Sequence, residues 1–198
     1  MSIVQRIRSV WRGRIQQWGN HALKRRLWNG EYAGGRWKHC ENTEEDPVYG
    51  FIEKYARHGR ILDLGCGAGN TGNELPAHAY SSYVGVDISD VAVAKAAERS
   101  RVNGRAERNQ YLAGDISKYV PEGHFDLILF RESMYYLRPN RIAAILERYS
   151  SSLKEGGVFM VTIYDRHAYP RVVHILNQYR LVEDFSPSSL ALSIKVFR

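Results

Sequence analysis

The sequence predicts an α/β protein built on a doubly wound, mostly parallel sheet of seven strands. After Gly59, short apolar runs typical of strands alternate with stretches typical of helices, and this alternation favours parallel strands joined by helical crossovers. The last two apolar runs, 181–185 and 191–197, are joined by so short a Ser-Pro turn that they must pair antiparallel. We therefore expect a Rossmann-like α/β fold that ends in an antiparallel strand and is preceded by N-terminal helices.

The remaining elements follow from the same patterns. Strands are expected at 60–64, 82–87, 109–113, 125–130 and 157–163, and helices at 70–76, 89–103, 138–154 and 167–178. Ahead of the sheet, apolar residues recur at helical spacing over 2–28, and Pro47 is placed to open a short helix over 47–58. The chain thus divides into a basic amphipathic helix at 1–28, an aromatic, glycine-rich lid with a helix at 29–58, and an α/β domain at 59–198.

The formal net charge of +7 lies entirely in the first 28 residues, which hold seven basic residues and no acid. The rest of the chain is neutral, so nucleic-acid binding by the main domain is not favoured. The two cysteines, Cys40 and Cys66, suit neither a disulfide framework nor a zinc site, and no apolar run is long enough to span a bilayer. We expect a cytoplasmic protein without a bound metal.

Three interpretations remain open for residues 1–28. The helix packs on the sheet or on a second subunit, or it lies on the inner face of a membrane, or it serves nucleic-acid binding or targeting. Its apolar face includes Trp11 and Trp18, and arginines flank that face, which suits an anionic bilayer surface.

A glycine-rich run, Asp63 to Gly69, follows the first expected strand directly. Glycines at a strand–turn–helix junction let the backbone turn sharply and approach a ligand closely. The spacing is GxGxG, and Asn70 stands where a dinucleotide fingerprint needs its third glycine. Asp87 closes the next strand, where an acid can accept both hydroxyls of a ribose. Asp115 and Ile116 follow the third strand and could hold an adenine.

The segments DLGCGAG, VGVDIS, AGDI, FDLILF and LKEGGVFMVT occur in this order within residues 59–163. In this they closely resemble the class I S-adenosylmethionine-dependent methyltransferases. The resemblance implies S-adenosylmethionine as cofactor, with Asp63 and the glycines at its methionine part, Asp87 at the ribose and Asp115 with Ile116 at the adenine. The residues expected to bind the cofactor are Asp63, Gly65, Cys66, Gly67, Asp87, Ile88, Asp115, Ile116 and Arg131.

Candidates for the chemistry lie after the fourth and fifth strands, where open parallel sheets bind ligands. Glu132 could accept a proton or orient the acceptor; alternatively it pairs with Arg131 or caps the next helix. Tyr135 and Tyr136 either line the acceptor pocket or belong to the core. His167 is a candidate general base, because His titrates near neutral pH, or it is simply solvated.

The aromatic segment before the main domain is similar to the lid of small bacterial methyltransferases from sugar, nodulation-factor and natural-product pathways. That resemblance implies that Tyr32, Arg36 and Trp37 close over the cofactor or the acceptor; alternatively the aromatics only pin a loop to the surface. The expected function is methyl transfer to an oxygen or nitrogen of a small molecule or saccharide, lipid-linked acceptors included.

Two other functions are weighed against it. One is an RNA or protein methyltransferase, which the neutral domain and the absence of an Asn-Pro-Pro-Tyr motif disfavour. The other is a non-catalytic module that binds S-adenosylmethionine. A nicotinamide dehydrogenase is disfavoured by Asn70 and Asp115.

Overall fold

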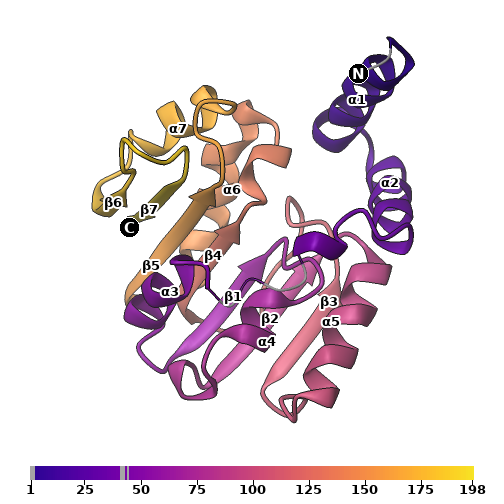
Figure 1. Cartoon of the computed structure of the whole chain (residues 1–198). Helices are drawn as coiled ribbons and strands as arrows, with labels where there is room; N and C mark the ends of the chain where they lie inside the picture. Colours follow the sequence, from indigo (N-terminus) through magenta and orange to yellow (C-terminus); the bar gives the residue numbers. More distant parts are fainter. Residues whose placement is uncertain (1–2, 41–42, 44) are drawn as a thin grey trace.

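The computed structural model describes residues 3–40, 43 and 45–198, and within them seven strands form one sheet in the order β3-β2-β1-β4-β5-β7-β6 (Figure 1). The strands are β1 Arg60–Leu64, β2 Ser82–Asp87, β3 Asn109–Ala113, β4 Phe125–Arg131, β5 Leu153–Ile163, β6 Leu181–Phe185 and β7 Ser193–Phe197. The first five pair in parallel, and β7 runs antiparallel between β5 and β6. The predicted fold class is confirmed.

Strand order reverses between β1 and β4, which makes the carboxyl ends of these two strands the expected place for a ligand. The sequence located most strand ends to within a residue or two, because each strand is an apolar run in a buried sheet. β5 is the exception. It begins at Leu153, four residues before the expected start at Gly157, and its residues 154–156 are exposed, so hydrophobicity does not mark them.

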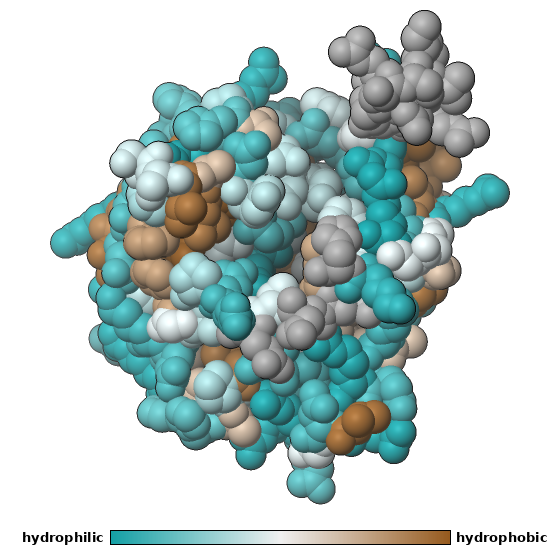
Figure 2. All heavy atoms as spheres, viewed as in Figure 1, coloured by the Kyte–Doolittle hydropathy of each residue, from teal (hydrophilic) through white to brown (hydrophobic). Residues whose placement is uncertain are grey.

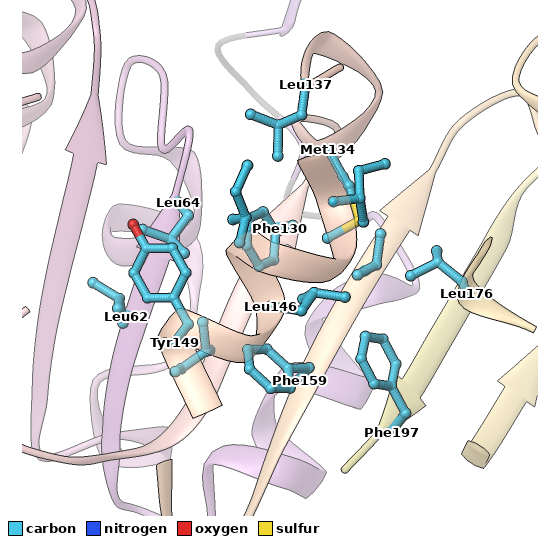
Figure 3. Close-up of a cluster of buried hydrophobic side chains, with 14 of the residues drawn as sticks. Leu62, Leu64, Phe130, Met134, Leu137, Leu146, Tyr149, Phe159, Leu176 and Phe197 are labelled. Carbon is cyan, nitrogen blue, oxygen red and sulfur yellow. The ribbon is translucent and has the colours of Figure 1, made fainter. Parts of the chain in front are cut away.

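Helices pack on both faces of the sheet. They are α3 Val48–Ala56, α4 Asn70–Glu74, α5 Asp90–Val102, α6 Ile142–Ser150 and α7 Pro170–Leu176, with short 3₁₀ turns η1 Lys38–Cys40, η2 Ala77–Ala79, η3 Met134–Tyr136 and η4 Pro139–Arg141. Ile128 and Phe130 of β4 face the core under α6 and α7 (Figure 3), and Leu127 and Leu129 face the core under α3. This alternation is the period of two that a strand buried on both faces requires.

The prediction of one helix over 2–28 is wrong. Two helices, α1 Ile3–Trp18 and α2 His21–Ala33, are separated at Gly19 and Asn20. The Asn20 side chain accepts a hydrogen bond from the amide of Leu23 at 2.9 Å and so caps the start of α2. A side chain at Gly19 would collide with the carbonyl of Ile15, which favours glycine at the end of α1.

The predicted lid at 29–46 is also partly helical, because α2 continues to Ala33 and η1 follows. Residues 1–2 of the predicted basic helix, and 41–42 and 44 of the predicted lid, lie outside the described residues. The helices expected at 138–154 and 167–178 are shorter than predicted, as are those at 70–76 and 47–58.

Polar contacts attach α2 to the start of α5. The Arg25 guanidinium donates to both carboxylate oxygens of Asp90 at 2.6 Å, and the Asn29 amide nitrogen donates to the same carboxylate at 3.1 Å. The Ser89 hydroxyl donates to the Asn29 amide oxygen at 2.8 Å. Lys95 of α5 donates to the backbone carbonyl of Tyr32 at 3.1 Å. These contacts hold α2 beside the loop that follows β2.

α1 lies apart from the sheet and beyond α2 (Figure 1). Its Trp11 and Trp18 are 60% and 53% exposed, so the structure does not support packing of this helix on the sheet. Among the helices that the structure describes, none is both long and apolar enough to cross a membrane.

Candidate active site

A cavity of about 620 Å³ opens at the carboxyl ends of the central strands, and Figure 2 shows a hollow near the centre of this face. All nine residues predicted to bind a cofactor line this cavity. So do Glu132, Tyr135, Tyr136, Tyr32 and Trp37 of the predicted catalytic and lid residues. The topology therefore brings together residues that are more than 100 positions apart in the sequence.

The glycine-rich loop is formed by residues that need left-handed backbone angles. Gly65, Gly67 and Gly69 have φ values of 91°, 55° and 79°. A Cβ atom at Gly65 would also collide with the Cβ of Ser133, which follows β4. The loop thus combines left-handed backbone angles with a close approach to Ser133, and only glycine can occupy position 65 without strain.

We expect Gly65→Ala to destabilise the protein more than Gly104→Ala, a matched control with φ 64° and no atom within 4 Å of the added methyl group. Both variants incur the left-handed cost of about 1–2 kcal/mol. Gly65→Ala adds an overpacking cost of about 1–3 kcal/mol, because Ser133 must move. Urea unfolding measures the difference, and equal losses in the two variants would contradict the close approach.

Asp63 carries a buried carboxylate that is only half satisfied. Its Oδ2 accepts a hydrogen bond from the Tyr83 hydroxyl at 2.6 Å, whereas its Oδ1 is buried in the cavity wall and has no hydrogen-bond partner among the described residues. Burial raises the pKa of Asp63 to about 6. A buried, unpaired carboxylate oxygen is costly, so this position fits a cationic ligand group such as the ammonium of a bound amino acid.

Asp87 joins the loops after β1 and β2. Its carboxylate accepts hydrogen bonds from the amides of Gly67 at 3.0 Å and Ser89 at 2.8 Å, and burial raises its pKa to about 6. The helix cap of α5 is Ser89, whose side chain accepts from the amide of Ala92. Asp87 is therefore not the cap of that helix, and its carboxylate lines the cavity at the end of β2.

Asp115 closes a turn and also faces α2. Its Oδ1 accepts hydrogen bonds from the amide and hydroxyl of Ser117 at 2.9 and 2.7 Å, and its Oδ2 lies 3.6 Å from Nδ1 of His21. Burial acts to raise the pKa of Asp115, but the Ser117 hydrogen bonds and the charges of Lys24 and His21 lower it overall. Ile116 lines the cavity beside it.

Glu132 neither pairs with Arg131 nor caps the next helix. Its Oε1 accepts from the Thr162 hydroxyl at 2.7 Å, and its Oε2 accepts from the amide of Tyr164 at 2.7 Å and the hydroxyl of Tyr135 at 3.1 Å. Its φ of 54° is unusual for a residue other than glycine, and burial raises its pKa. A half-buried acid with a strained backbone in a cavity is typical of a functional position.

Arg131 lines the cavity but is already occupied. Its guanidinium donates to the Tyr49 hydroxyl and to Asp46, both at 2.8 Å, and to the Thr43 hydroxyl at 3.0 Å. It therefore holds the segment before α3 against the end of β4. Because these contacts use the guanidinium, the structure assigns Arg131 a part in shaping the cavity wall beside the predicted cofactor site.

His167 does not line the cavity, which corrects its prediction as a general base. The Asp165 carboxylate accepts hydrogen bonds from the amides of His167 and Ala168, and this turn leaves His167 exposed on the surface. Arg36 is also outside the cavity; it is exposed, and its guanidinium lies 4.0 Å from Glu31.

An aromatic cluster forms the cavity wall next to Glu132. The sequence missed its central member, Trp28, whose ring lies 4.9 Å from Tyr136, 5.7 Å from Trp37 and 6.3 Å from Tyr32. Trp28 and Tyr32 are four residues apart on α2 and so share one helix face. This spacing could have identified Trp28, but the sequence-based boundary placed Trp28 at the end of the predicted helix and Tyr32 in the predicted lid. Gln16 and Lys24 also line the cavity unexpectedly.

Comparison with known proteins agrees with this arrangement. Residues 62–159, about half of the chain, match the family described as a methyltransferase domain. The mRNA cap guanine-N(7) methyltransferase of Schizosaccharomyces pombe is 29% identical over 126 residues, covering 57% of this chain and 35% of that protein. Trans-aconitate 2-methyltransferase of Rhizobium rhizogenes is 29% identical over 143 residues, covering 70% of this chain and 52% of that protein. This chain thus spans a third to a half of their lengths.

Solved structures share the fold. The N-methyltransferase NodS of Bradyrhizobium japonicum, in complex with S-adenosyl-L-homocysteine, has a TM-score of 0.69 and 21% identity, with 88% of this chain and 97% of that chain covered. The magnesium protoporphyrin IX methyltransferase of Synechocystis, with bound S-adenosylmethionine, has a TM-score of 0.69 and 16% identity, with 90% and 96% covered. Fold and cavity define a Rossmann-like α/β protein with a ligand cavity at the carboxyl ends of its central strands.

The family match and the curated relatives make that class more specific. The chain belongs to the class I S-adenosylmethionine-dependent methyltransferases, whose cofactor is S-adenosylmethionine.

Proposed function

We propose that this protein transfers a methyl group from S-adenosylmethionine to an oxygen or nitrogen of a small molecule or saccharide. The carrying observation is that one cavity joins two parts: the buried acids Asp63 and Asp87, which suit the cofactor, and an aromatic wall with Glu132, which suits an acceptor. When bound, S-adenosylmethionine supplies a methyl group on a positively charged sulfur, so the donor is already activated. The protein's part is then largely to position two molecules in line.

The residues divide this work between them. Asp63 accepts the ammonium group of the cofactor's methionine part at its unpaired Oδ1, and Asp87 accepts the ribose hydroxyls. Asp115 and Ile116 hold the adenine, and the absence of side chains at the loop glycines lets the backbone approach the cofactor. Glu132 faces the acceptor, and Tyr135 acts as a positioning residue by donating its hydroxyl hydrogen bond to Glu132.

Calorimetry and a labelled-methyl screen test this proposal together. We expect S-adenosylhomocysteine to bind and NAD not to bind, and we expect methyl label to appear in low-molecular-weight acceptors from a metabolite and glycolipid extract. Label only in RNA or protein would redirect the proposal to those acceptors, and the similarity to a cap methyltransferase makes capped RNA the RNA to include. Cofactor binding with no labelled product would favour the non-catalytic module.

We also propose that α1 docks on an anionic membrane surface. Residues 1–28 carry seven basic residues and no acid, and α1 leaves Trp11 and Trp18 largely exposed next to the exposed Arg14. The Arg138 guanidinium lies 5.1 Å from the centroid of the Trp18 ring, which nevertheless remains 53% exposed. Exposed tryptophans on a basic helix suit the boundary between lipid headgroups and acyl chains.

We expect the double variant Trp11→Ala, Trp18→Ala to reduce sedimentation with phosphatidylglycerol vesicles by about tenfold, because interfacial binding scales with buried apolar area. Val120→Ala, at an equally exposed apolar residue far along the chain, serves as the matched control and should bind like the unaltered protein. If both variants bind equally well, or if the unaltered protein forms a dimer that the double variant lacks, the membrane interpretation is wrong.

A further inference from the structure

Among the described residues, Glu132 is the acid of the cavity that has neither an ion pair nor a part in the proposed cofactor site, although the charge of the neighbouring Arg131 acts to lower its pKa. Asp46 is bound to Arg131, and Asp115 lies near His21 and Lys24. Asp63 and Asp87 are the two acids proposed to hold the cofactor. Among the carboxylates that line the cavity in the described part of the chain, these assignments leave Glu132.

The donors around Glu132 are all neutral: the Thr162 hydroxyl, the Tyr135 hydroxyl and the Tyr164 amide. Three such hydrogen bonds favour the ionised carboxylate and offset part of the cost of burying it. Burial still leaves the pKa of Glu132 raised, but both of its carboxylate oxygens already accept hydrogen bonds from these donors. Glu132 is therefore better placed to stabilise a positive charge beside it than to take a proton from a hydroxyl group.

Aromatic rings line the same cavity as this carboxylate, and Tyr135 contacts it directly through its hydroxyl group. Trp28, Tyr32, Trp37 and Tyr136 line the same cavity, and the ring of Tyr135 lies 4.6 Å from that of Tyr136. Tyr135 is in turn fixed by stacking on Tyr169, with ring centroids 4.1 Å apart and planes inclined by 10°. The faces of such rings attract cations, most strongly where water is excluded. A carboxylate and a cluster of aromatic rings together form a recognised environment for an ammonium group.

We propose that the methyl acceptor is an amine whose nitrogen is held between Glu132 and this aromatic wall. The inference rests on the proposed methyl transfer and names the substrate class for it. An amine that arrives as its ammonium form first gives up a proton to water, and the nitrogen lone pair of the neutral amine then forms the new N–C bond. The C–S bond of the sulfonium breaks, its electron pair stays on sulfur, and the positive charge passes to the nitrogen. The methylated nitrogen then loses its proton to water.

This charge movement explains why the surroundings of Glu132 suit an amine better than a hydroxyl group. As the methyl group moves, positive charge grows on the nitrogen, and both the carboxylate and the ring faces stabilise it there. A hydroxyl acceptor would instead require a base to take up its proton, and the three donors on Glu132 oppose that role.

Binding of two isosteric probes tests the inference without turnover. Choline carries a quaternary ammonium group, and 3,3-dimethyl-1-butanol has the same shape without the charge. With the protein saturated by S-adenosylhomocysteine, we expect calorimetry to show choline binding about tenfold or more tighter than the neutral probe, as expected for a desolvated cation–π site. Glu132→Gln should remove that preference, while Glu155→Gln, at an exposed acid far from the cavity, should retain it.

The possible results distinguish failure of the amine-acceptor inference from failure of the proposed methyl-transfer function. Equal affinity for the two probes, or no binding of either, would overturn the amine acceptor while leaving methyl transfer intact if S-adenosylhomocysteine still binds. Failure of S-adenosylhomocysteine itself to bind would overturn the proposed function. Tighter binding of a nucleoside than of choline would also contradict the inference. Because Glu132 is half-buried and hydrogen-bonded, the substitution Glu132→Gln could also disturb folding. Its thermal unfolding and S-adenosylhomocysteine affinity must match those of Glu155→Gln for the loss of choline binding to count as support.

Discussion

Asp63→Asn is expected to stabilise the protein without ligand and to weaken binding of S-adenosylhomocysteine by about 100-fold or more. The two effects have one origin, a buried carboxylate whose Oδ1 has no hydrogen-bond partner among the described residues and is proposed to receive the cofactor's ammonium group. Removing one member of a buried ion pair typically costs about 3–5 kcal/mol, which sets the expected loss of affinity. Calorimetry with S-adenosylhomocysteine measures it.

The stability effect depends on pH in a defined direction. The folded pKa of Asp63, about 6, is raised above its unfolded value by burial, so the folded state loses stability as pH rises from about 4 to 6 and bears the full cost above that range. A shift of this size corresponds to a maximum on the order of 3 kcal/mol. Asp63→Asn removes that cost, and its advantage in urea unfolding should be largest at pH 7.5 and should shrink towards pH 4.

The variant Tyr83→Phe is expected to change the stability of the protein in the opposite direction to Asp63→Asn. It deletes the hydroxyl group that donates to Asp63 at 2.6 Å and leaves the carboxylate with less support, so this variant should be less stable than the unaltered protein. In the Asp63→Asn background the same change should cost less. A loss of stability in Asp63→Asn at pH 7.5, or an unchanged affinity for S-adenosylhomocysteine, would contradict this role. Asp63 would then not be a destabilising buried carboxylate that binds a cationic ligand group.

Asp87→Ala is expected to weaken S-adenosylhomocysteine binding by about tenfold or more. The change removes the acceptor for the ribose hydroxyls, and hydrogen bonds to a charged group contribute about 1.5–3 kcal/mol. It also frees the amides of Gly67 and Ser89, which Asp87 now holds in place. Asp87→Asn retains one acceptor oxygen and should lose less. Isothermal calorimetry at pH 7.5 compares the two.

The affinity for S-adenosylhomocysteine should also decrease as the pH is lowered. Because burial raises the pKa of Asp87 to about 6, the carboxylate becomes protonated as the pH falls through 6, and binding of the ribose hydroxyls weakens. Asp87→Asn should show a shallower pH dependence, with the contribution of Asp63 remaining. Glu98→Gln, at an exposed acid on α5, is the control and should bind normally. Unchanged affinity in Asp87→Ala would refute the ribose role.

The sheet could be predicted from the sequence because buried parallel strands carry their own hydrophobic signal. The break between α1 and α2 was missed for a different reason. Apolar residues continue at helical spacing across Gly19 and Asn20, while the decisive feature is the Asn20 side chain that caps α2. Gly followed by Asn is a recognisable end-and-start signal, and it outweighs periodicity where the two disagree.

The position of the predicted cofactor residues at the cavity could be foreseen because they stand at or just after strand ends, which the fold brings together. The contacts of individual side chains could not. The Arg131 guanidinium is bound by Asp46, Tyr49 and Thr43, which lie more than 80 residues earlier in the chain. His167 was placed correctly after the last parallel strand, but the turn at Asp165 leaves it exposed. Such long-range and local polar contacts leave no periodic pattern in a sequence.

The attachment of α2 to the Ser89–Asp90 turn has a kinetic consequence. Arg25 and Asn29 of α2 form hydrogen bonds with this turn, which directly follows the loop of the proposed ribose acid Asp87. Trp28 and Tyr32, which line the cavity, belong to the same helix. Binding of the cofactor is therefore expected to order the aromatic side chains of α2 that line the proposed acceptor site. We expect an ordered mechanism in which S-adenosylmethionine binds before the methyl acceptor. Product-inhibition patterns report that sequence. S-adenosylhomocysteine should compete with S-adenosylmethionine alone, and random-order patterns would mean that helix and turn move independently.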